Sequence, residues 1–333
     1  MNLRIPFLAA SGVVGLGAFV LGQTSSPAPQ AGTTYTFKRP VYNGYGLERL
    51  EDLRGKPVLI EFWSYHCPPC VSSAIPETLR LKAKYGDDLQ LLFAETGGAS
   101  ENQVLSFALS KGWLGSPAMW TTELPLRREG NDTPYFALLS AEGEIVLEGV
   151  TTERATEIET SVAELVKDGE KVPRETSREL AKALAESGEG NFARARELAL
   201  KELDAAGEDA AKAQDAKHVI AQIEERLDLK VKQARWMLEN GYPIEAGEAI
   251  DKLGKSVKGW EERENQLAGF AEELATPEMK LELEAQKALQ KIERKVFEDP
   301  DVRWVKSLQK IVEKYPRTKT AERAKKLAKI AAI

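Results

Sequence analysis

The two cysteines of this 333-residue chain, Cys67 and Cys70, are separated by two prolines and closely follow a short apolar run. That run, Val58–Trp63, is rich in branched and aromatic residues and predicts a buried strand. Prolines are well tolerated in the first turn of a helix, so a helix is expected to begin at this pair. One helical turn then brings the two sulfurs within disulfide reach. Cys67 is expected near the helix N-terminus, where unpaired N–H groups and the helix dipole stabilise a thiolate.

The cysteine pair has three chemical interpretations: a redox-active dithiol, a structural disulfide, or half of a zinc site. Zinc normally takes four ligands, and the only histidines of the chain are His66 and His218. A structural disulfide across so short a loop adds little chain-entropy stabilisation. The preceding strand and the downstream Thr133-Pro134 dipeptide favour the redox interpretation. We therefore expect no metal, and no cofactor besides the redox-active disulfide itself.

Two stretches of the chain resemble a known enzyme family. LEDLRGKPVLIEFW followed by CPPC, and Thr133-Pro134 followed by YFALLSAEGEIVLEGV, are similar to the TlpA/ResA-like thiol-disulfide oxidoreductases of the bacterial cell envelope, within the thioredoxin-like superfamily. The resemblance covers about residues 35–168. It implies an α/β thioredoxin-like fold, a mixed sheet with helices on both faces. At matching positions, Cys67 is the attacking cysteine, Cys70 the resolving one, and Pro134 a cis-proline beside them.

The same resemblance assigns further residues to the site. Glu61 falls where thioredoxins keep a buried acid, which would exchange a proton with Cys70. The alternative is a solvent-facing acid on an edge strand. His66 replaces the tryptophan that usually precedes the first cysteine, and it is either an exposed bystander or a cation that stabilises the thiolate. His66, Trp63 and Thr133 are the candidates for tuning the redox potential. Pro76 stands one residue later than the family pattern and is expected to kink the helix.

The N-terminus predicts export. Arg4, an apolar run to Gly22 and a polar Ser- and Pro-rich stretch have the order of a secretory signal. We assign residues 1–22 to a signal peptide and residues 23–33 to a flexible spacer, with an uncleaved membrane anchor as the alternative. The expected location is the periplasm or cell envelope. The net charge of -6 gives no reason to expect nucleic acid as a partner.

Residues 34–170 follow an α/β pattern. Strands are expected at 35–41 on the sheet edge, 58–63, 89–94 and 119–122, with a hairpin at 136–139 and 145–150. Leu47, Leu50 and Leu53 suit one helical turn packed on the sheet. Ser100 can cap a helix ended by Gly112, and a helix at about 153–167 closes the domain.

Residues 171–333 are predicted to be all-helical. Ala, Glu, Lys and Leu dominate there and strand signals stop. Two similar openings, GNFARA and GYPIEA, suggest tetratricopeptide-like helical repeats, with a coiled hairpin as the alternative. Residues 211–240 suit two helices or one long one. Trp236, Trp260 and Trp304 are expected to be core residues rather than the lining of a peptide groove.

Two functions remain open at this point. The first is a thiol-disulfide oxidoreductase acting on exported protein thiols or disulfides, with reduction as the favoured direction and a membrane electron donor as a further partner. The second is a helical interaction scaffold that carries an accessory thioredoxin-like domain. In both, the helical half is expected to bind a protein partner. Its removal is expected to spare activity on small disulfides and to slow reaction with a protein client.

Overall fold

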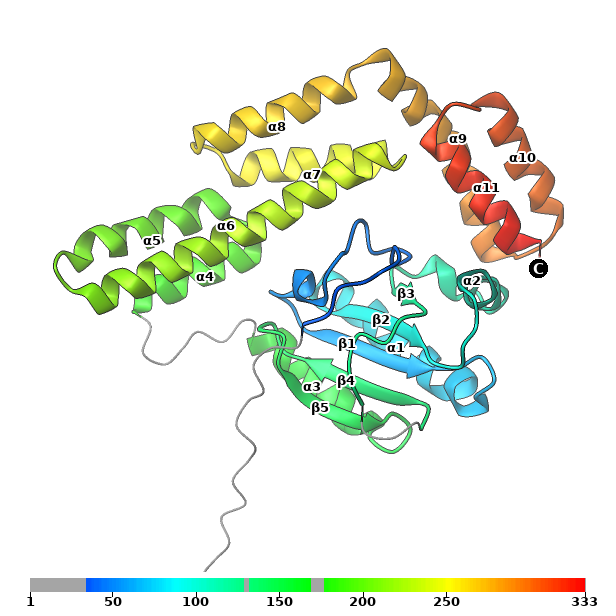
Figure 1. Cartoon of the computed structure of the whole chain (residues 1–333), viewed down its shortest axis with the longest axis horizontal. Helices are drawn as coiled ribbons and strands as arrows, with labels where there is room; N and C mark the ends of the chain where they lie inside the picture. Colours follow the sequence, from blue (N-terminus) through cyan, green and yellow to red (C-terminus); the bar gives the residue numbers. More distant parts are fainter. Residues whose placement is uncertain (1–33, 129–131, 169–176, 333) are drawn as a thin grey trace, which may run out of the picture.

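The computed structural model describes residues 34–128, 132–168 and 177–332. The predicted signal peptide, the spacer and the boundary at residue 170 lie outside these residues. The described part consists of a sheet domain and a long helical region that arches over it (Figure 1).

The sheet has five strands in the order β3-β2-β1-β4-β5. β1 is parallel to β2, and β2 is parallel to β3. β4 runs antiparallel to both β1 and β5. The mixed sheet predicted from the sequence is therefore confirmed, and the strand before the cysteines lies at its centre. The strands are β1 (Val58–Trp63), β2 (Gln90–Glu95), β3 (Met119–Thr121), β4 (Tyr135–Leu139) and β5 (Ile145–Val150).

Side chains alternate along the strands and place two apolar layers on the sheet. Leu59 and Trp63 of β1 belong to a buried cluster with α1 (Ile75–Tyr85), α2 (Glu101–Ser110) and α3 (Ala155–Asp168). Ile60 and Phe62 belong to the cluster on the other face, which the N-terminal segment covers with its short 3-10 helix η1 (Leu50–Leu53). The predicted turn of helix at Leu50 and Leu53, and the Ser100 cap of α2, are confirmed.

The edge strand predicted at residues 35–41 is wrong. This segment makes one isolated bridge to another described residue, between Thr36 and Arg49. The N–H groups of Lys38 and Arg39 donate instead to the carboxylate of Glu123, and proline at the next position has no N–H to donate. A remote side chain thus takes the hydrogen bonds that a neighbouring strand would need.

The described residues from 177 onward contain helices and short connections only, as predicted. Residues 211–240 form one long helix rather than two. Successive helices pack against one another from α4 to α8, and α10 packs on α11. This arrangement does not establish tetratricopeptide-like repeats, which stay a prediction. The helices are α4 (Arg178–Glu189), α5 (Phe192–Ala206), α6 (Ala210–Glu239), α7 (Pro243–Ser256), α8 (Glu261–Leu274), α9 (Pro277–Glu298), α10 (Arg303–Lys314) and α11 (Lys319–Ala331).

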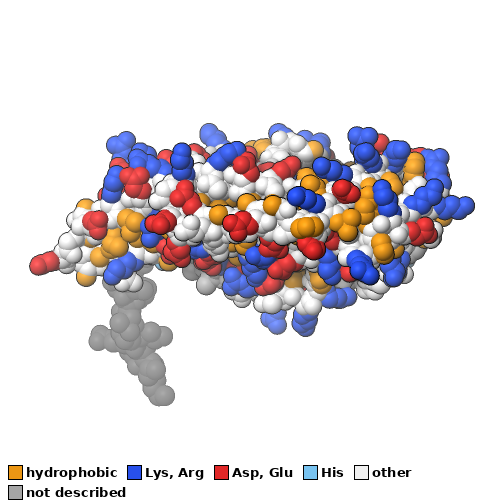
Figure 2. Space-filling view, turned by 90° about the horizontal axis from the view of Figure 1, so that it is seen from above, with side chains coloured by type: hydrophobic (Ala, Val, Ile, Leu, Met, Phe, Trp, Pro, Cys, Tyr) orange, Lys and Arg blue, Asp and Glu red, His pale blue; other side chains and the backbone are white. Residues whose placement is uncertain are grey.

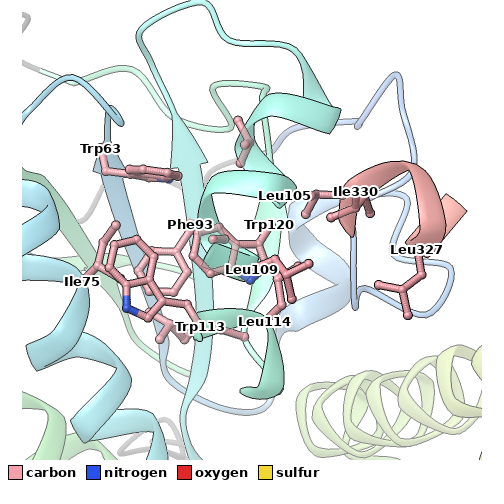
Figure 3. Packing of buried hydrophobic residues seen from close by; sticks show 14 of the residues in the cluster. Trp63, Ile75, Phe93, Leu105, Leu109, Trp113, Leu114, Trp120, Leu327 and Ile330 are labelled. Carbon is pink, nitrogen blue, oxygen red and sulfur yellow. The ribbon is translucent and has the colours of Figure 1, made fainter. Parts of the chain in front are cut away.

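The hydrophobic cores divide the helical region in two. Helices α4 to α8 enclose a core of their own. Apolar residues of α9, α10 and α11 belong instead to the cluster that packs on β1 and α2. Ile330 of α11 lies beside Leu105 of α2 (Figure 3), and Leu327 belongs to the same buried cluster. The Ser106 hydroxyl also donates to the Ile330 carbonyl at 2.8 Å. The last helices are therefore part of the sheet domain's core.

A second contact joins α6 to the loop that precedes η1. Tyr45 packs edge-on against Trp236 and Tyr242, with ring centroids 6.4 and 5.3 Å away. Gly46 has a φ of +81°, and a Cβ there would lie 2.7 Å from Cγ of Trp236. Only glycine fits such a close approach. The arch is thus anchored to the sheet domain at two places.

The surface of the arch in Figure 2 carries Lys and Arg interspersed with Asp and Glu. Several of these charges pair within one helical turn, for example Arg194 with Glu197 and Lys255 with Asp251. This is the pattern of an ordinary solvated helix surface. None of the helices in the described ranges is long and apolar enough to span a membrane.

The three tryptophans predicted to be core residues are each only half-buried. Trp236 belongs to the contact with Tyr45 described above. Trp260 lies under the guanidinium groups of Arg196 and Arg263, at 4.5 and 5.3 Å from its ring centroid. Each of the three tryptophans is therefore partly packed and partly exposed. The core prediction for these tryptophans is met only in part.

Candidate functional site

Cys67 and Cys70 form a disulfide, with their Cα atoms 5.3 Å apart. Cys70 is 0% exposed, whereas Cys67 is half-buried. The backbone N–H of Cys70 donates to Sγ of Cys67 at 3.2 Å. A thiolate at Cys67 would accept the same hydrogen bond, and an incoming disulfide can reach only this sulfur. The geometry therefore separates an accessible cysteine from a buried one.

The helix that carries the pair begins at Pro68, as the sequence predicts. Cys70–Ala74 then forms a π-helical turn, in which the N–H of Ile75 bonds to the carbonyl of Cys70. Pro76 follows at the start of α1, where its missing N–H is harmless. The late proline is thus accommodated by one wide turn directly after the cysteines. Such π-turns are frequent at functional sites.

The Thr133-Pro134 peptide bond is cis, as expected. Pro134 is buried, and it directly precedes β4. Phe62 of β1 pairs with Tyr135 of β4, so Pro134 stands opposite Trp63 at the end of β1. This is the end from which the chain runs into Cys67. The proline therefore lies at the same edge of the sheet as the cysteine pair, and Thr133 beside it is half-buried.

Glu61 is buried in the middle of β1 with 0% exposure, which rules out the solvent-facing alternative. It shares its face of the strand with Leu59 and Trp63, which pack in the same cluster as Cys70. Burial raises the pKa of Glu61 well above its usual 4.5, and a hydrogen bond from Thr151 offsets part of that rise. A carboxyl group of this kind keeps its proton to a higher pH than an exposed one and can exchange that proton with a thiol.

His66 is exposed, and its role in tuning the redox potential stays a prediction. The His66 ring lies 3.8 Å from that of Tyr65, centroid to centroid. The backbone N–H of His66 donates to the Ser64 hydroxyl. His218 is exposed on α6, where its ring nitrogen contacts the Gln222 amide. The two histidines are therefore on different parts of the molecule. The described ranges contain no cluster of His, Cys, Asp or Glu suited to a metal ion.

Trp63 is the centre of an aromatic cluster under the disulfide. It is fully buried, and Phe107, Trp113 and Trp120 lie about it with centroids 6.1, 6.2 and 5.8 Å away. Phe107 comes from α2, the helix that α11 holds in place. Trp63 thus belongs to the same buried cluster as Cys70 and the apolar residues of α9, α10 and α11. Its predicted tuning role stays a prediction.

Sequence reasoning missed Thr151, which follows β5 and contacts two of the predicted site residues. Its hydroxyl donates to Oε1 of Glu61 at 2.8 Å. Its backbone N–H donates to the Pro134 carbonyl at 3.1 Å. A threonine after a hairpin has no distinguishing pattern in one sequence. Only the folded position of the hairpin reveals it.

The strand order, the cysteine pair after β1 and the cis-proline before β4 define a thioredoxin-like fold. This is the fold class predicted from the sequence. A long all-helical region follows it in the chain.

Neither a protein-family model nor a curated protein sequence matches this chain. Solved structures do match it. A thioredoxin-like superfamily protein is 19% identical with a TM-score of 0.37, covering 44% of this chain and 100% of its own. A thiol-disulfide isomerase from Corynebacterium glutamicum is 17% identical with a TM-score of 0.34, covering 41% of this chain and 96% of its own. A thiol:disulfide interchange protein from Chlorobium tepidum is 13% identical with a TM-score of 0.34, covering 43% of this chain and 99% of its own.

The raised pKa of Glu61 predicts a pH dependence of stability. The folded protein keeps this proton to a higher pH than the unfolded chain does, because burial disfavours the carboxylate. Between the two pKa values the folded state binds more protons, so the free energy of unfolding falls as pH rises. One proton gives a slope of at most about 1.4 kcal/mol per pH unit.

Glu61→Gln removes this titration. As pH rises from the unfolded to the folded pKa of Glu61, the free energy of unfolding of the variant is therefore expected to increase relative to that of the wild type. Above the folded pKa, the difference between the two proteins should stay constant. Denaturant unfolding of both oxidised proteins over a pH series measures the difference. Parallel stability curves for the two proteins would contradict an elevated pKa for Glu61.

Proposed function

We propose that this chain is an exported thiol-disulfide oxidoreductase in which Cys67 attacks and Cys70 resolves. The observation that carries the proposal is the pairing of a half-exposed Cys67 at a helix start with a fully buried Cys70. Glu61 on the same face of β1 and Pro134 at the same edge of the sheet support it. The redox-active disulfide is the only cofactor proposed.

The reaction begins with the reduced pair. The Cys67 thiolate attacks a client disulfide, which forms a Cys67–client disulfide and releases one client thiolate. Glu61 then accepts the proton of the Cys70 thiol. The Cys70 thiolate attacks Sγ of Cys67, the Cys67–Cys70 bond forms, and the second client thiolate leaves. The two client thiolates then take up two protons, one from Glu61 and one from the solvent, which received the Cys67 proton when its thiolate formed. The client thus gains two electrons and two protons, and the protein loses the same number.

The cycle is completed by a dithiol reductant that returns the disulfide to two thiols. In an oxidising compartment such electrons come from outside, and a membrane electron donor meets this need. We favour the reductase direction and a site of action in the periplasm or cell envelope, which rests on the predicted N-terminal signal. Protein thiols or disulfides are the proposed substrates. Binding of a protein partner by the helical region stays a prediction.

Insulin reduction tests the proposal. With dithiothreitol as the electron source, the wild-type protein is expected to shorten the lag before the insulin B chain precipitates. Catalytic amounts should suffice, because each molecule turns over many times. A rate no greater than that of dithiothreitol alone would contradict the proposed function.

A further inference from the structure

We propose that Thr151 is a positioning residue for the thiol-disulfide reaction, acting through Glu61 and through the backbone of Pro134. This inference rests on the proposed function and adds a residue to it. Thr151 touches neither cysteine in the contacts described above. It would act by holding the proton-exchanging carboxyl and the cis-proline loop in one hydrogen-bonded unit.

The geometry joins three segments that are remote in sequence. Thr151 is 3% exposed and directly follows β5. Its hydroxyl binds Oε1 of Glu61 on the central strand at 2.8 Å. Its N–H binds the carbonyl of Pro134 at 3.1 Å, at the start of β4. A single residue therefore hydrogen-bonds both to Glu61 on the central strand and to the cis-proline before β4.

Among the described residues, the Thr151 hydroxyl is the only hydrogen-bond donor to the Glu61 carboxyl group. Oε2 of Glu61 is buried and has no hydrogen-bond partner among the described residues. The side chains opposite Glu61 in the register are Phe93 on β2 and Phe136 on β4. The helices packed on this face contribute apolar residues to the cluster, among them Ile75 of α1 and Ile158 of α3.

The neighbouring strands carry two further carboxylates, Glu95 and Glu148, and neither pairs with Glu61 in the sheet register. Glu95 of β2 stands opposite Trp63, and its two carboxylate oxygens accept the N–H groups of Gly97 and Ala99. Glu148 of β5 pairs with Ala137 rather than with a β1 residue. The pKa of Glu61 is raised by burial and lowered by the hydrogen bond from Thr151.

The consequence is control over the second step of the reaction. A hydroxyl that donates to the carboxylate stabilises the form of Glu61 able to take the proton of Cys70. It also occupies Oε1 and leaves Oε2 as the oxygen free to receive that proton. Without the hydroxyl, Glu61 is protonated up to a higher pH, and resolution of the mixed disulfide slows on the acid side.

Two substitutions separate the hydroxyl from the shape of the side chain. Thr151→Val removes the donor and keeps the branched volume, whereas Thr151→Ser keeps the donor and removes a methyl group. Both leave the N–H bond to Pro134 available. Glu61→Gln, alone and combined with Thr151→Val, tests whether the effect passes through Glu61.

The first readout is independent of activity. In the oxidised full-length protein, the ¹³C shift of the Glu61 carboxyl reports its titration midpoint. We expect the midpoint to rise in Thr151→Val and to stay close to the wild type in Thr151→Ser. An unchanged midpoint in a folded Thr151→Val variant would overturn the inference.

The second readout is the decay of the mixed disulfide with glutathione, followed by acid quenching and intact mass over a pH series. Thr151→Val is expected to slow this decay about tenfold on the acid side and to approach the wild-type rate at high pH. Thr151→Ser should stay within roughly twofold of the wild type. In the Glu61→Gln background, Thr151→Val should have no further effect on the pH profile.

A uniform slowing at every pH, or a defect shared equally by Thr151→Ser, would overturn the positioning role while leaving the oxidoreductase intact. Failure of the proposed function is recognised differently. In that case the wild-type protein itself forms no mixed disulfide at any pH, whatever the midpoint of Glu61.

Discussion

Replacing Cys70 by serine is expected to trap a mixed disulfide at Cys67 and to abolish turnover. Cys67 lies at the helix start with its sulfur partly exposed, so it still attacks a disulfide offered to it. The second bond cannot form without the Cys70 thiol, and the adduct accumulates. Intact mass after incubation of the variant with oxidised glutathione measures one adduct per protein.

Cys67→Ser is the matched control. It keeps a cysteine in the same turn of helix, but that sulfur is 0% exposed. We expect no adduct and no insulin reduction above the rate of the reductant alone. A Cys67→Ser variant that reacts as fast as Cys70→Ser would reverse the assigned roles of the two cysteines.

Truncating Leu327 and Ile330 of α11 to alanine is expected to destabilise the sheet domain and to reduce activity on every substrate. Both side chains are buried in the cluster that includes α2, and Phe107 of α2 stacks on the ring of Trp63. Each truncation costs about 2 to 5 kcal/mol in a well-packed core. The sum is comparable with the whole stability of an ordinary domain, about 5 to 15 kcal/mol.

Leu198→Ala combined with Leu253→Ala provides a control of similar size. These residues are equally buried but belong to the core of α4 to α8, which contains no residue of the sheet domain. We expect this pair to lower the stability of the arch and to retain reduction of a small disulfide. Denaturant unfolding and hydrogen exchange in α2 distinguish the two variants. Equal loss of activity in both would show that the two cores unfold together.

The shared core changes what removal of the helices should do. The sequence alone predicts that cutting the chain before residue 171 spares activity on small disulfides. In the folded protein, that cut would expose the apolar face of α2 that α11 covers. We now expect activity on small and protein substrates alike to be lost, because α2, whose Phe107 packs on Trp63, loses its contact with α11.

Local patterns in the sequence were sufficient to predict the strand before the cysteines, the helix that begins at them, and the hairpin after Pro134. Val58–Trp63, the cysteine turn and Thr133-Pro134 each carry their signal within a few residues. The fold class and the positions of both cysteines followed from these signals. The burial of Glu61 followed from its place in an apolar run.

Features that depend on remote partners could not be predicted in this way. Glu123 binds the backbone of Lys38 and Arg39 across 84 or more residues and prevents the expected edge strand. Thr151 reaches Glu61 over a separation of 90 residues. The apolar residues of α11 show the same helical period whether they face a neighbouring helix or the sheet domain, so periodicity alone cannot choose the partner.

Direct transfer of electrons from the pair to a protein disulfide tests the central claim most simply. The full-length protein is reduced, freed of reductant and mixed with oxidised insulin, and both sets of thiols are counted by alkylation and mass. We predict that Cys67 and Cys70 lose their thiols together while insulin gains an equal number. Retention of both thiols in the presence of insulin disulfides would contradict an oxidoreductase function for this chain.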